Sequence, residues 1–479
     1  MKNTLQVSSF PKHFCASLAV SASLLLVACG GGGSGGGSTS SAPSAQFMAS
    51  DTFFNQCDGG TQEKAFLRSF IDETYLWYKD VPALAPADYA TPQAYFADLK
   101  TPARTASGSY VDQFHTSMPT TDFNTAMSGN GSGYGIQWLA QSTVAPRNLV
   151  VGYVEPNSPA ALAGIQRGDR LTAVDGVDFV NNNTQQGVDA LNAGLSPSSQ
   201  SAHGLAFNGG AAVALSPAVF STQTVHNVNV FATQAGVQVG YFAFDSHLQK
   251  SEDELIAAIN QLKANNVTAL VIDMRYNGGG LLQIASQLGY MIAGPDATQG
   301  KTFERILYND KRSASNWSMP FAAVSSKGEA LPSLGLREVT FLVTHDTASA
   351  SESLINGLRG IDVKVNLIGD TTRGKPYGFV PQSNCGTIYL AVQFKGVNHK
   401  GEGDYVDGMP FTCLARDDFA HAVGSPEETM LKAAMWYLET GSCAAAASAQ
   451  MVMRASSQHY TLMRSAVQEM RVLPDIPKP

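Results

Sequence analysis

Apolar strand-like runs alternate with amphipathic helical runs from residue 237 onward. The segment 237–244 (VQVGYFAF) has the character of a strand, and 251–266 has the apolar spacing of a helix. The apolar run 267–277 (VTALVIDMRYN) is typical of a strand covered on both faces, and helical spacing follows at 281–294. A strand, a helix and a strand recur within 338–370. This order predicts βαβ units around a largely parallel sheet.

The region 129–235 has shorter apolar runs that are separated by turn residues. A strand at 149–154 precedes Ser158, which suits the cap of a short helix. A second strand at 170–174 ends in an Asp-Gly pair at 175–176, which predicts a tight hairpin turn. This order resembles a PDZ domain.

The resemblance assigns a peptide-binding role to one loop of this region. The sequence GYGI matches the carboxylate-binding loop of PDZ domains, whose backbone N–H groups face a peptide C-terminus. The strand that follows would accept the peptide by edge addition, beside a groove helix at 184–194. The alternative is a small β-rich domain without a peptide function. The loop residues are Gly133, Tyr134, Gly135 and Ile136.

Residues 51–128 combine an aromatic-rich helical run with loops. Within 63–81 the aromatic side chains recur at near-helical intervals, which predicts an amphipathic helix whose aromatics lie in a core. We therefore expect a small N-terminal helical domain. To the tail 444–479, which is rich in Ala, Ser and Met, the sequence assigns no function.

The first residues have the pattern of a secretory signal. The apolar run 18–29 follows two lysines and is too short to span a bilayer. Its end, LVAC, resembles a bacterial lipobox, which predicts removal of residues 1–28 and a lipid on Cys29. The Gly- and Ser-rich segment 29–50 then predicts a flexible tether. The alternative is ordinary cleavage nearby, which leaves Cys29 as a free thiol.

These features predict a lipid-anchored protein of the bacterial cell envelope that faces the periplasm. Gly30, directly after Cys29, is compatible with the outer membrane. The net charge of −8 argues against a nucleic-acid partner, because phosphate binding needs a basic face. A hydrophobic content of 44% indicates that most of the 479 residues build a packed core.

Four cysteines remain once those of the predicted signal and lipid site are set aside. An even number in an oxidising compartment is compatible with two disulfides, and the sequence leaves all three pairings open. Buried free thiols are the alternative. None of the four has CxxC spacing, so no metal site is predicted from them. They are Cys57, Cys385, Cys413 and Cys443.

The segment TASASE (347–352) lies where a predicted buried strand passes into a helix. A helix N-terminus offers unpaired N–H groups, which favour the negative charge that develops in acyl transfer. Ser349 is therefore a candidate nucleophile, and the N–H of Ala350 is a candidate oxyanion donor. The alternatives are Ser351 as nucleophile, or a purely capping role for both serines.

A base and a second oxyanion donor are expected at the same sheet edge. Lys375 follows the next strand, and one βαβ step returns the chain beside its start. Burial makes such an amine a stronger base candidate at neutral pH. The N–H of Gly278 or Gly279, with Gly278 preferred, would complete the oxyanion hole. His345 is an alternative base. Four carboxylates are typical of turns and have no strong metal-ligand spacing: Asp404, Asp407, Asp417 and Asp418.

Together these motifs resemble those of the C-terminal processing (tail-specific) serine peptidases, over about residues 60–440. DMRYNGGG, TASASE and IGDTTRGK carry the resemblance. It implies an α/β (α+β) multidomain fold without a cofactor, with a Ser349–Lys375 dyad. Many relatives carry a Gln four residues after the Lys. Here that position is Phe379, and Gln382 is a candidate substitute. The implied domains are helical (51–128), PDZ-like (129–235) and a crotonase-like peptidase core (236–443).

We therefore expect a serine endopeptidase that cleaves envelope proteins near their C-termini through an acyl-enzyme. The PDZ-like domain would capture the substrate's C-terminus. Two rival interpretations stay open. One is an inactive PDZ-bearing envelope adaptor, which the missing Gln motivates. The other is an acyl-thioester enzyme of crotonase-like architecture, which predicts a coenzyme A pocket.

Overall fold

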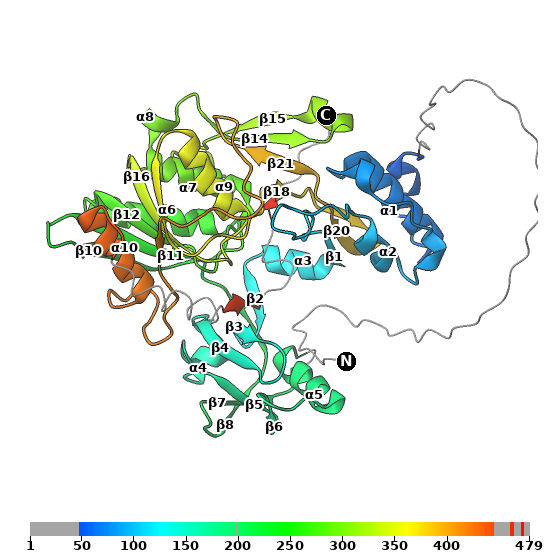
Figure 1. Cartoon of the computed structure of the whole chain (residues 1–479), viewed down its shortest axis with the longest axis horizontal. Coiled ribbons are helices and arrows are strands. Elements are labelled where there is room, and N and C mark those ends of the chain that lie inside the picture. Colours follow the sequence, from blue (N-terminus) through cyan, green and yellow to red (C-terminus); the bar gives the residue numbers. More distant parts are fainter. Residues whose placement is uncertain (1–46, 198–199, 445–459, 464–470, 474–479) are drawn as a thin grey trace, which may run out of the picture.

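Three packed units make up the molecule (Figure 1). The computed structural model describes residues 47–197, 200–444, 460–463 and 471–473. The predicted signal, the lipid site at Cys29 and the tether up to residue 46 lie outside the described residues. No helix within the described ranges has the length and apolar character needed to cross a membrane.

The largest unit, the peptidase core, is built on a six-stranded sheet. The strand order is β10-β11-β12-β16-β17-β22, in which β10 is antiparallel to β11 and all other neighbours are parallel. This confirms the prediction of βαβ units around a largely parallel sheet. The strands are β10 (Val225–Ala232), β11 (Gln238–Phe244), β12 (Ala269–Asp273), β16 (Glu338–Val343), β17 (Lys364–Gly369) and β22 (Cys413–Leu414).

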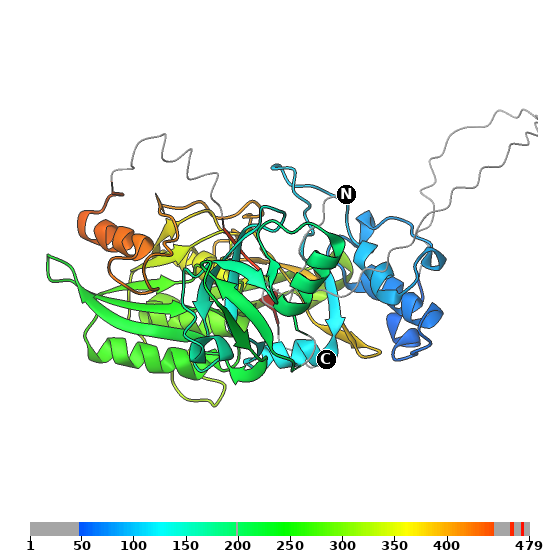
Figure 2. The same cartoon turned by 90° about the horizontal axis from the view of Figure 1, so that it is seen from below.

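Helices cover both faces of this sheet (Figure 2). Alternate side chains of a strand point to opposite faces, so Phe242 and Phe244 pack with α6, α7 and α9, while Tyr241 packs with α10. Burial on both faces explains why the strands are near-continuous apolar runs. The helices are α6 (Ser251–Ala264), α7 (Leu282–Ala293), α9 (Ala350–Gly360) and α10 (Thr429–Thr440).

A four-stranded antiparallel sheet in the order β15-β14-β21-β18 completes the peptidase core. It packs against α9, where the backbone at Gly357 approaches the ring of Phe303 so closely that a Cβ would lie 2.8 Å from it. The remaining elements of this unit are β13 (Gly280–Leu281), α8 (Pro295–Thr298), β14 (Thr302–Tyr308), η4 (Asp310–Ser315), β15 (Trp317–Pro320), β18 (Tyr377–Gly378) and β21 (Phe394–Val397).

The PDZ-like unit (residues 130–221) follows the predicted order of strands and helices closely. Ser158 caps α4 by accepting a hydrogen bond from the N–H of Ala161 (3.3 Å). Asp175 and Gly176 make the tight turn between β5 and β6 with φ of 49° and 78°. The elements are β2 (Asn130–Gly133), β3 (Ile136–Ser142), β4 (Asn148–Val154), α4 (Pro159–Leu162), β5 (Leu171–Val174), β6 (Val177–Asp178), α5 (Gln185–Leu195), β7 (His203–Phe207), β8 (Ala212–Leu215) and β9 (Ala218–Ser221).

β10 precedes the predicted boundary between residues 235 and 236, but it belongs to the large sheet. It is the edge strand of that sheet and pairs with β11 from Val225↔Phe244 to Ala232↔Gln238. An alternating strand pattern shows that one face is buried, without showing which sheet buries it. The large sheet therefore includes residues from Val225 onward.

The N-terminal helical region packs together with a hairpin from late in the chain. β1 pairs with β20, which lies more than 260 residues later. Aromatic residues of α1 share one hydrophobic core with this late hairpin, as the sequence predicted for a core role. We call this unit the N-terminal layer: η1 (Ser50–Phe53), α1 (Thr61–Thr74), η2 (Tyr78–Asp80), η3 (Pro86–Asp88), α2 (Pro92–Asp98), β1 (Thr116–Pro119), α3 (Thr120–Met127), β19 (Gln382–Asn384) and β20 (Thr387–Leu390).

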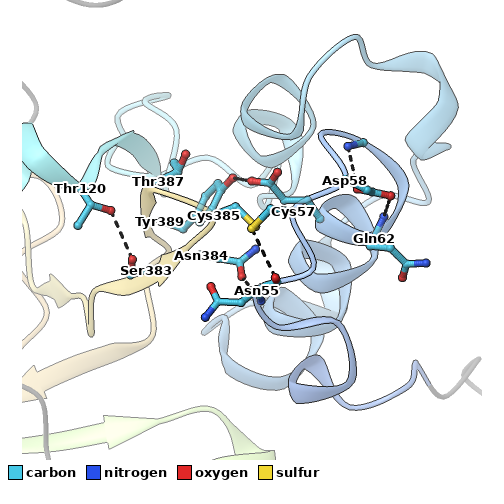
Figure 3. The surroundings of a disulfide bond; sticks show 12 residues. Asn55, Cys57, Asp58, Gln62, Thr120, Ser383, Asn384, Cys385, Thr387 and Tyr389 are labelled. Carbon is cyan, nitrogen blue, oxygen red and sulfur yellow. Dashed lines mark hydrogen bonds between the residues drawn. A yellow bond between two sulfur atoms is a disulfide. The ribbon is translucent and has the colours of Figure 1, made fainter.

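Two disulfides settle the pairing that the sequence left open. Cys57 is bonded to Cys385, and Cys413 to Cys443, with Cα–Cα distances of 5.4 and 5.5 Å. Figure 3 shows the first bond between the start of the N-terminal layer and the turn between β19 and β20. Beside it, the N–H of Asn55 donates to the side-chain carbonyl of Asn384 (2.8 Å).

We expect the two disulfides to differ in their contribution to stability. The residues that they join are 328 and 30 positions apart, and a cross-link that closes a longer loop restricts the unfolded chain more. Loss of the Cys57–Cys385 bond should therefore lower the free energy of unfolding by about 2 kcal/mol more than loss of the other bond. Guanidinium unfolding of the two double Cys→Ser variants measures this difference. Equal losses would contradict it.

Candidate active site

Ser349 lies at the turn between β16 and α9, where it is fully buried. Its φ of 65° and ψ of −116° are rare for a residue with a side chain, so the backbone is held in a strained conformation there. Its Oγ has no hydrogen-bond partner among the described residues, yet Ser349 and Glu352 have the arrangement of a capping box at the start of α9. The capping alternative is therefore not contradicted.

A buried carboxylate organises the backbone around Ser349. Glu352 accepts four hydrogen bonds: from the N–H groups of Ser349 (2.8 Å), Gly374 (2.7 Å) and Lys375 (2.8 Å), and from the hydroxyl of Thr372 (2.6 Å). Burial raises the pKa of the Glu352 carboxyl, and the hydrogen bonds that it accepts oppose this shift.

The same oxygen atom of Glu352 joins the two residues of the predicted dyad. Ser349 and Lys375 both donate their backbone N–H groups to Oε2 of Glu352. Each nitrogen lies 2.8 Å from this oxygen, which holds the two backbone segments side by side. The structure therefore brings together the two loops that the βαβ argument placed at one sheet edge. The sequence motif contained Glu352, but no role was predicted for it.

The amine of Lys375 is enclosed by aromatic rings. The residue is 1% exposed, and its Nζ lies 4.5 Å from the ring centroid of Phe114 and 4.6 Å from that of Phe379. Phe114 comes from the N-terminal layer, so this wall could not be foreseen from the core motifs. Gln382 gains no support as the residue that orients the amine, because its side-chain amide donates to the carbonyl of Ser383 (3.0 Å).

Two backbone N–H groups face the turn without an acceptor among the described residues: those of Gly278 and Ala350. The N–H of Gly279 instead donates to the side-chain oxygen of Asn277 (2.9 Å). The carbonyl of Asn277 accepts from the N–H of Ala348 (3.0 Å), which ties the glycine run to the turn before α9. Of the two glycines proposed as oxyanion donors, Gly278 is the one with its N–H available.

A buried histidine, His247, contacts the glycine run at residues 278–280 through its ring and its backbone. The Nδ1 of His247 lies 3.1 Å from the Oδ1 of Asn277, and its backbone pairs on either side of Gly280 with Gly279 and Leu281. Burial lowers the pKa of His247 to about 3, so the ring is neutral at physiological pH. This positioning residue was not predicted.

The alternative site residues have structural contacts of their own. The hydroxyl of Ser351 donates to the Asn277 carbonyl (3.1 Å). His345 follows the end of β16 and lies with its Nε2 3.2 Å from Nη1 of Arg373. Neither arrangement resembles an activated nucleophile with its base.

One predicted turn acid is instead part of a buried ion network. Asp417 accepts from Arg275 and from Arg167 (both 2.6 Å), and Arg275 also binds Asp273 and Glu428. The two guanidinium groups hold the pKa of Asp417 at about 2 against the effect of burial. Arg167 belongs to the PDZ-like unit, so this network joins that unit to the end of β12. The described chain holds no cluster of three or more His, Cys, Asp and Glu arranged for a metal.

The loop Gly133–Ile136 lies between β2 and β3, as predicted. The carbonyls of Tyr134 and Gly135 accept hydrogen bonds from the N–H groups of Ala160 (2.9 Å) and Glu155 (2.8 Å). The N–H groups of Tyr134 and Gly135 find no acceptor in the described part of the chain. The loop lines a cavity of about 500 Å³ between the PDZ-like unit and the peptidase core.

Family comparisons agree with this arrangement of units. The chain matches peptidase family S41 over residues 238–384, a PDZ domain over 150–194 and the peptidase S41 N-terminal domain over 62–113. The chain is thus similar to peptidase family S41 over its N-terminal part and its largest unit. Among S41 structures, that of a candidate S41 protease from Bacteroides fragilis has 24% sequence identity and a TM-score of 0.62, and covers 78% of this chain and 97% of that chain. It confirms the fold.

Curated relatives are named as processing peptidases. The carboxyl-terminal-processing protease of Picosynechococcus is 28% identical over 52% of this chain and 55% of its own length. Carboxyl-terminal-processing peptidase 2 of Arabidopsis thaliana, a chloroplastic protein, is 27% identical over 64% of this chain and 58% of its own. The chain thus spans a little over half the length of these relatives.

The buried histidine His247 gives the protein a predictable sensitivity to acid. The folded-state pKa of His247 is about 3 and the ordinary value is 6.5, so the unfolded chain takes up the proton first as the pH falls. Its stabilising contribution is complete above pH 6.5 and is lost toward pH 3. Between pH 7 and pH 4, the wild-type free energy of unfolding should fall by about 3 kcal/mol more than that of His247→Gln. Parallel urea titrations at both pH values measure this, and identical losses would count against it.

Proposed function

We propose that the protein is a serine endopeptidase that acts near the C-termini of cell-envelope proteins. The observation that carries the proposal is the joint anchoring of the backbone N–H groups of Ser349 and Lys375 on one oxygen of Glu352. A strained serine at a helix N-terminus, a buried amine and free glycine and alanine amides are the parts that acyl transfer needs.

The reaction begins when the neutral amine of Lys375 takes the proton of the Ser349 hydroxyl. The alkoxide oxygen attacks the scissile carbonyl, and the N–H groups of Gly278 and Ala350 stabilise the resulting oxyanion. The leaving amine takes the proton from Lys375 as the C–N bond breaks, and an acyl-enzyme remains. Water then attacks the ester with Lys375 again acting as base, which restores Ser349 and releases the new carboxyl end.

Lys375 is 1% exposed, and burial disfavours an ammonium, which supports the neutral amine that the mechanism requires. Contacts with the rings of Phe114 and Phe379 act in the opposite direction.

The PDZ-like unit supplies the preference for chain ends. Free N–H groups at Tyr134 and Gly135 suit a peptide carboxylate, and the edge of β3 suits an extended peptide. Burial raises the pKa of nearby Glu155 to about 7, which limits its charge repulsion of a carboxylate up to neutral pH. The names of the processing relatives point to the same substrate class.

The N-terminal sequence and the disulfides support a location in the cell envelope. Two disulfides suit an oxidising compartment such as the periplasm. A lipid on Cys29 and a tether to residue 50 would hold the folded units beside the membrane, with Gly30 favouring the outer membrane.

Replacement of either dyad residue should abolish turnover. We expect Ser349→Ala to lose cleavage of an unstructured protein substrate and covalent labelling by a fluorophosphonate, because the proposed nucleophile is removed. Lys375→Ala should reduce both by at least about 10³-fold, while Lys395→Ala, an exposed lysine on β21, keeps them.

Each rival interpretation has its own outcome in this experiment. Labelling that survives in Ser349→Ala but disappears in Ser351→Ala would move the nucleophile to Ser351. Peptide binding without turnover in the wild type would identify an adaptor. Hydrolysis of an acyl-coenzyme A thioester, with none of a peptide, would identify the thioester enzyme.

The pH–rate profile tests the base. We expect kcat/KM to rise with pH along a limb well below ~10.4, the ordinary value of a free lysine, because burial favours the neutral amine. His247 should not contribute a limb above pH 5, since its pKa is about 3. A limb near the free-lysine value would refute the buried-amine mechanism, and a limb lost in His345→Ala would assign the base to His345.

A further inference from the structure

Two short segments near the end of the sequence lie on the surfaces that the proposed function gives to substrate. They are residues 460–463 and 471–473, which we call the tail segments. The sequence assigned no function to this region. Each segment adds a strand to an existing edge, one in the PDZ-like unit and one beside the glycine run.

The first tail segment occupies the peptide edge of the PDZ-like unit. β23 (Thr461–Leu462) runs antiparallel to β3, with Thr461 opposite Ala140 and Leu462 opposite Leu139. The N–H of Met463 extends the ladder by donating to the carbonyl of Trp138 (2.8 Å). β3 begins directly after the candidate carboxylate loop, so this is the edge at which an extended peptide would add.

Side chains anchor the first segment to two units at once. The phenol oxygen of Tyr460 accepts from Arg170 (2.9 Å) in the PDZ-like unit. The N–H of Leu462 donates to the carboxylate of Asp346 (2.8 Å), three residues before Ser349. The side chain of Leu462 is 9% exposed and packs with Leu139, Val150 and Tyr276.

The second tail segment lies beside the proposed oxyanion hole. β24 (Arg471–Val472) runs parallel to β13, with Arg471 opposite Gly280, two residues after Gly278. The N–H of Leu473 then donates to the carbonyl of Phe379 (3.3 Å), whose ring contacts the Lys375 amine. Leu473 is 1% exposed within the core cluster that contains Ala350.

We propose that the tail segments are a resident occupant of the peptide track, which a substrate must displace before cleavage. This inference rests on the proposed function, because the track is the one that function assigns to substrate. Backbone pairing at both edges holds the segments as it would hold any extended peptide, and the buried Leu473 marks a subsite that takes an aliphatic side chain. The protein is thereby held in a restrained state that competes with substrate.

The same contacts would also suit a permanent structural link between the units. The two roles differ in how release of the tail segments affects activity and peptide binding. A structural link that is broken loosens the core and lowers activity. When a competing occupant is released, its site becomes available to other peptides. Their apparent dissociation constant then falls in proportion to the fraction of molecules whose site had been occupied.

The kinetic test uses Leu473→Asp in the full chain. A carboxylate at this buried position opposes occupancy, so we expect KM for a fluorogenic peptide to fall at least tenfold while kcat stays within about twofold. Leu162→Asp makes the same chemical change at a leucine that is 83% exposed on α4, and should leave both constants unchanged. Tyr460→Phe removes only the phenol hydrogen bonds and should lower KM by a smaller factor.

A binding measurement separates this inference from the proposed function. In a Ser349→Ala background, a fluorescein-labelled peptide with the sequence of residues 460–473 should bind at least tenfold more tightly to Leu473→Asp than to the chain with Leu473. If binding tightens but no variant cleaves peptides, the peptidase proposal fails and the occupant stands. If cleavage occurs but neither KM nor peptide binding changes, or if both tail variants only lose activity, the occupant proposal is overturned.

Discussion

The candidate active site depends on one buried carboxylate. Glu352 accepts hydrogen bonds from two loops that follow different strands, β16 and β17, and so sets the distance between Ser349 and Lys375. Without this acceptor, buried backbone donors would be unpaired, at about 1–3 kcal/mol each. Because Glu352 accepts from the backbone N–H groups of both residues, it fixes the two loops relative to each other.

The end of β12 is fixed by a second set of contacts, and charge is kept away from the reactive groups there. The guanidinium of Arg275 forms ion pairs with Asp273, Asp417 and Glu428 in a buried network. The glycine run two residues on is held by neutral partners, the amide of Asn277 and the uncharged ring of His247. An oxyanion at this loop would meet oriented dipoles that are held by neutral partners, which favours electrostatic stabilisation.

Local patterns in the sequence predicted the parts of the fold that depend on local physics. The cap at Ser158, the turn at residues 175–176 and the doubly covered strands follow from hydrogen bonding and burial within a few residues. The partners of β10 and β1 were missed, because pairing across long separations leaves no trace in periodicity. The disulfide pairing was open for the same reason.

The candidate site also contains residues that the topology predicts and one that only distant packing supplies. Ser349, Lys375, Gly278 and Ala350 each follow a strand of one sheet, so the topology alone brings them to one edge. Phe114 could not be predicted, because it reaches Lys375 from a layer that is joined to the core by β1, β20 and a disulfide.

The rings of Phe114 and Phe379 form an aromatic wall around the Lys375 amine, and Phe379 stands where many relatives carry a Gln. A glutamine orients an amine by a hydrogen bond, whereas the rings of Phe114 and Phe379 orient it by shape and by their electron-rich faces. Such a wall also excludes water, which strengthens every electrostatic interaction with the reacting atoms. The absence of a Gln therefore does not by itself favour an inactive adaptor, because another means of holding the amine stands in its place. This also makes the N-terminal layer, which supplies Phe114, a working part of the active site.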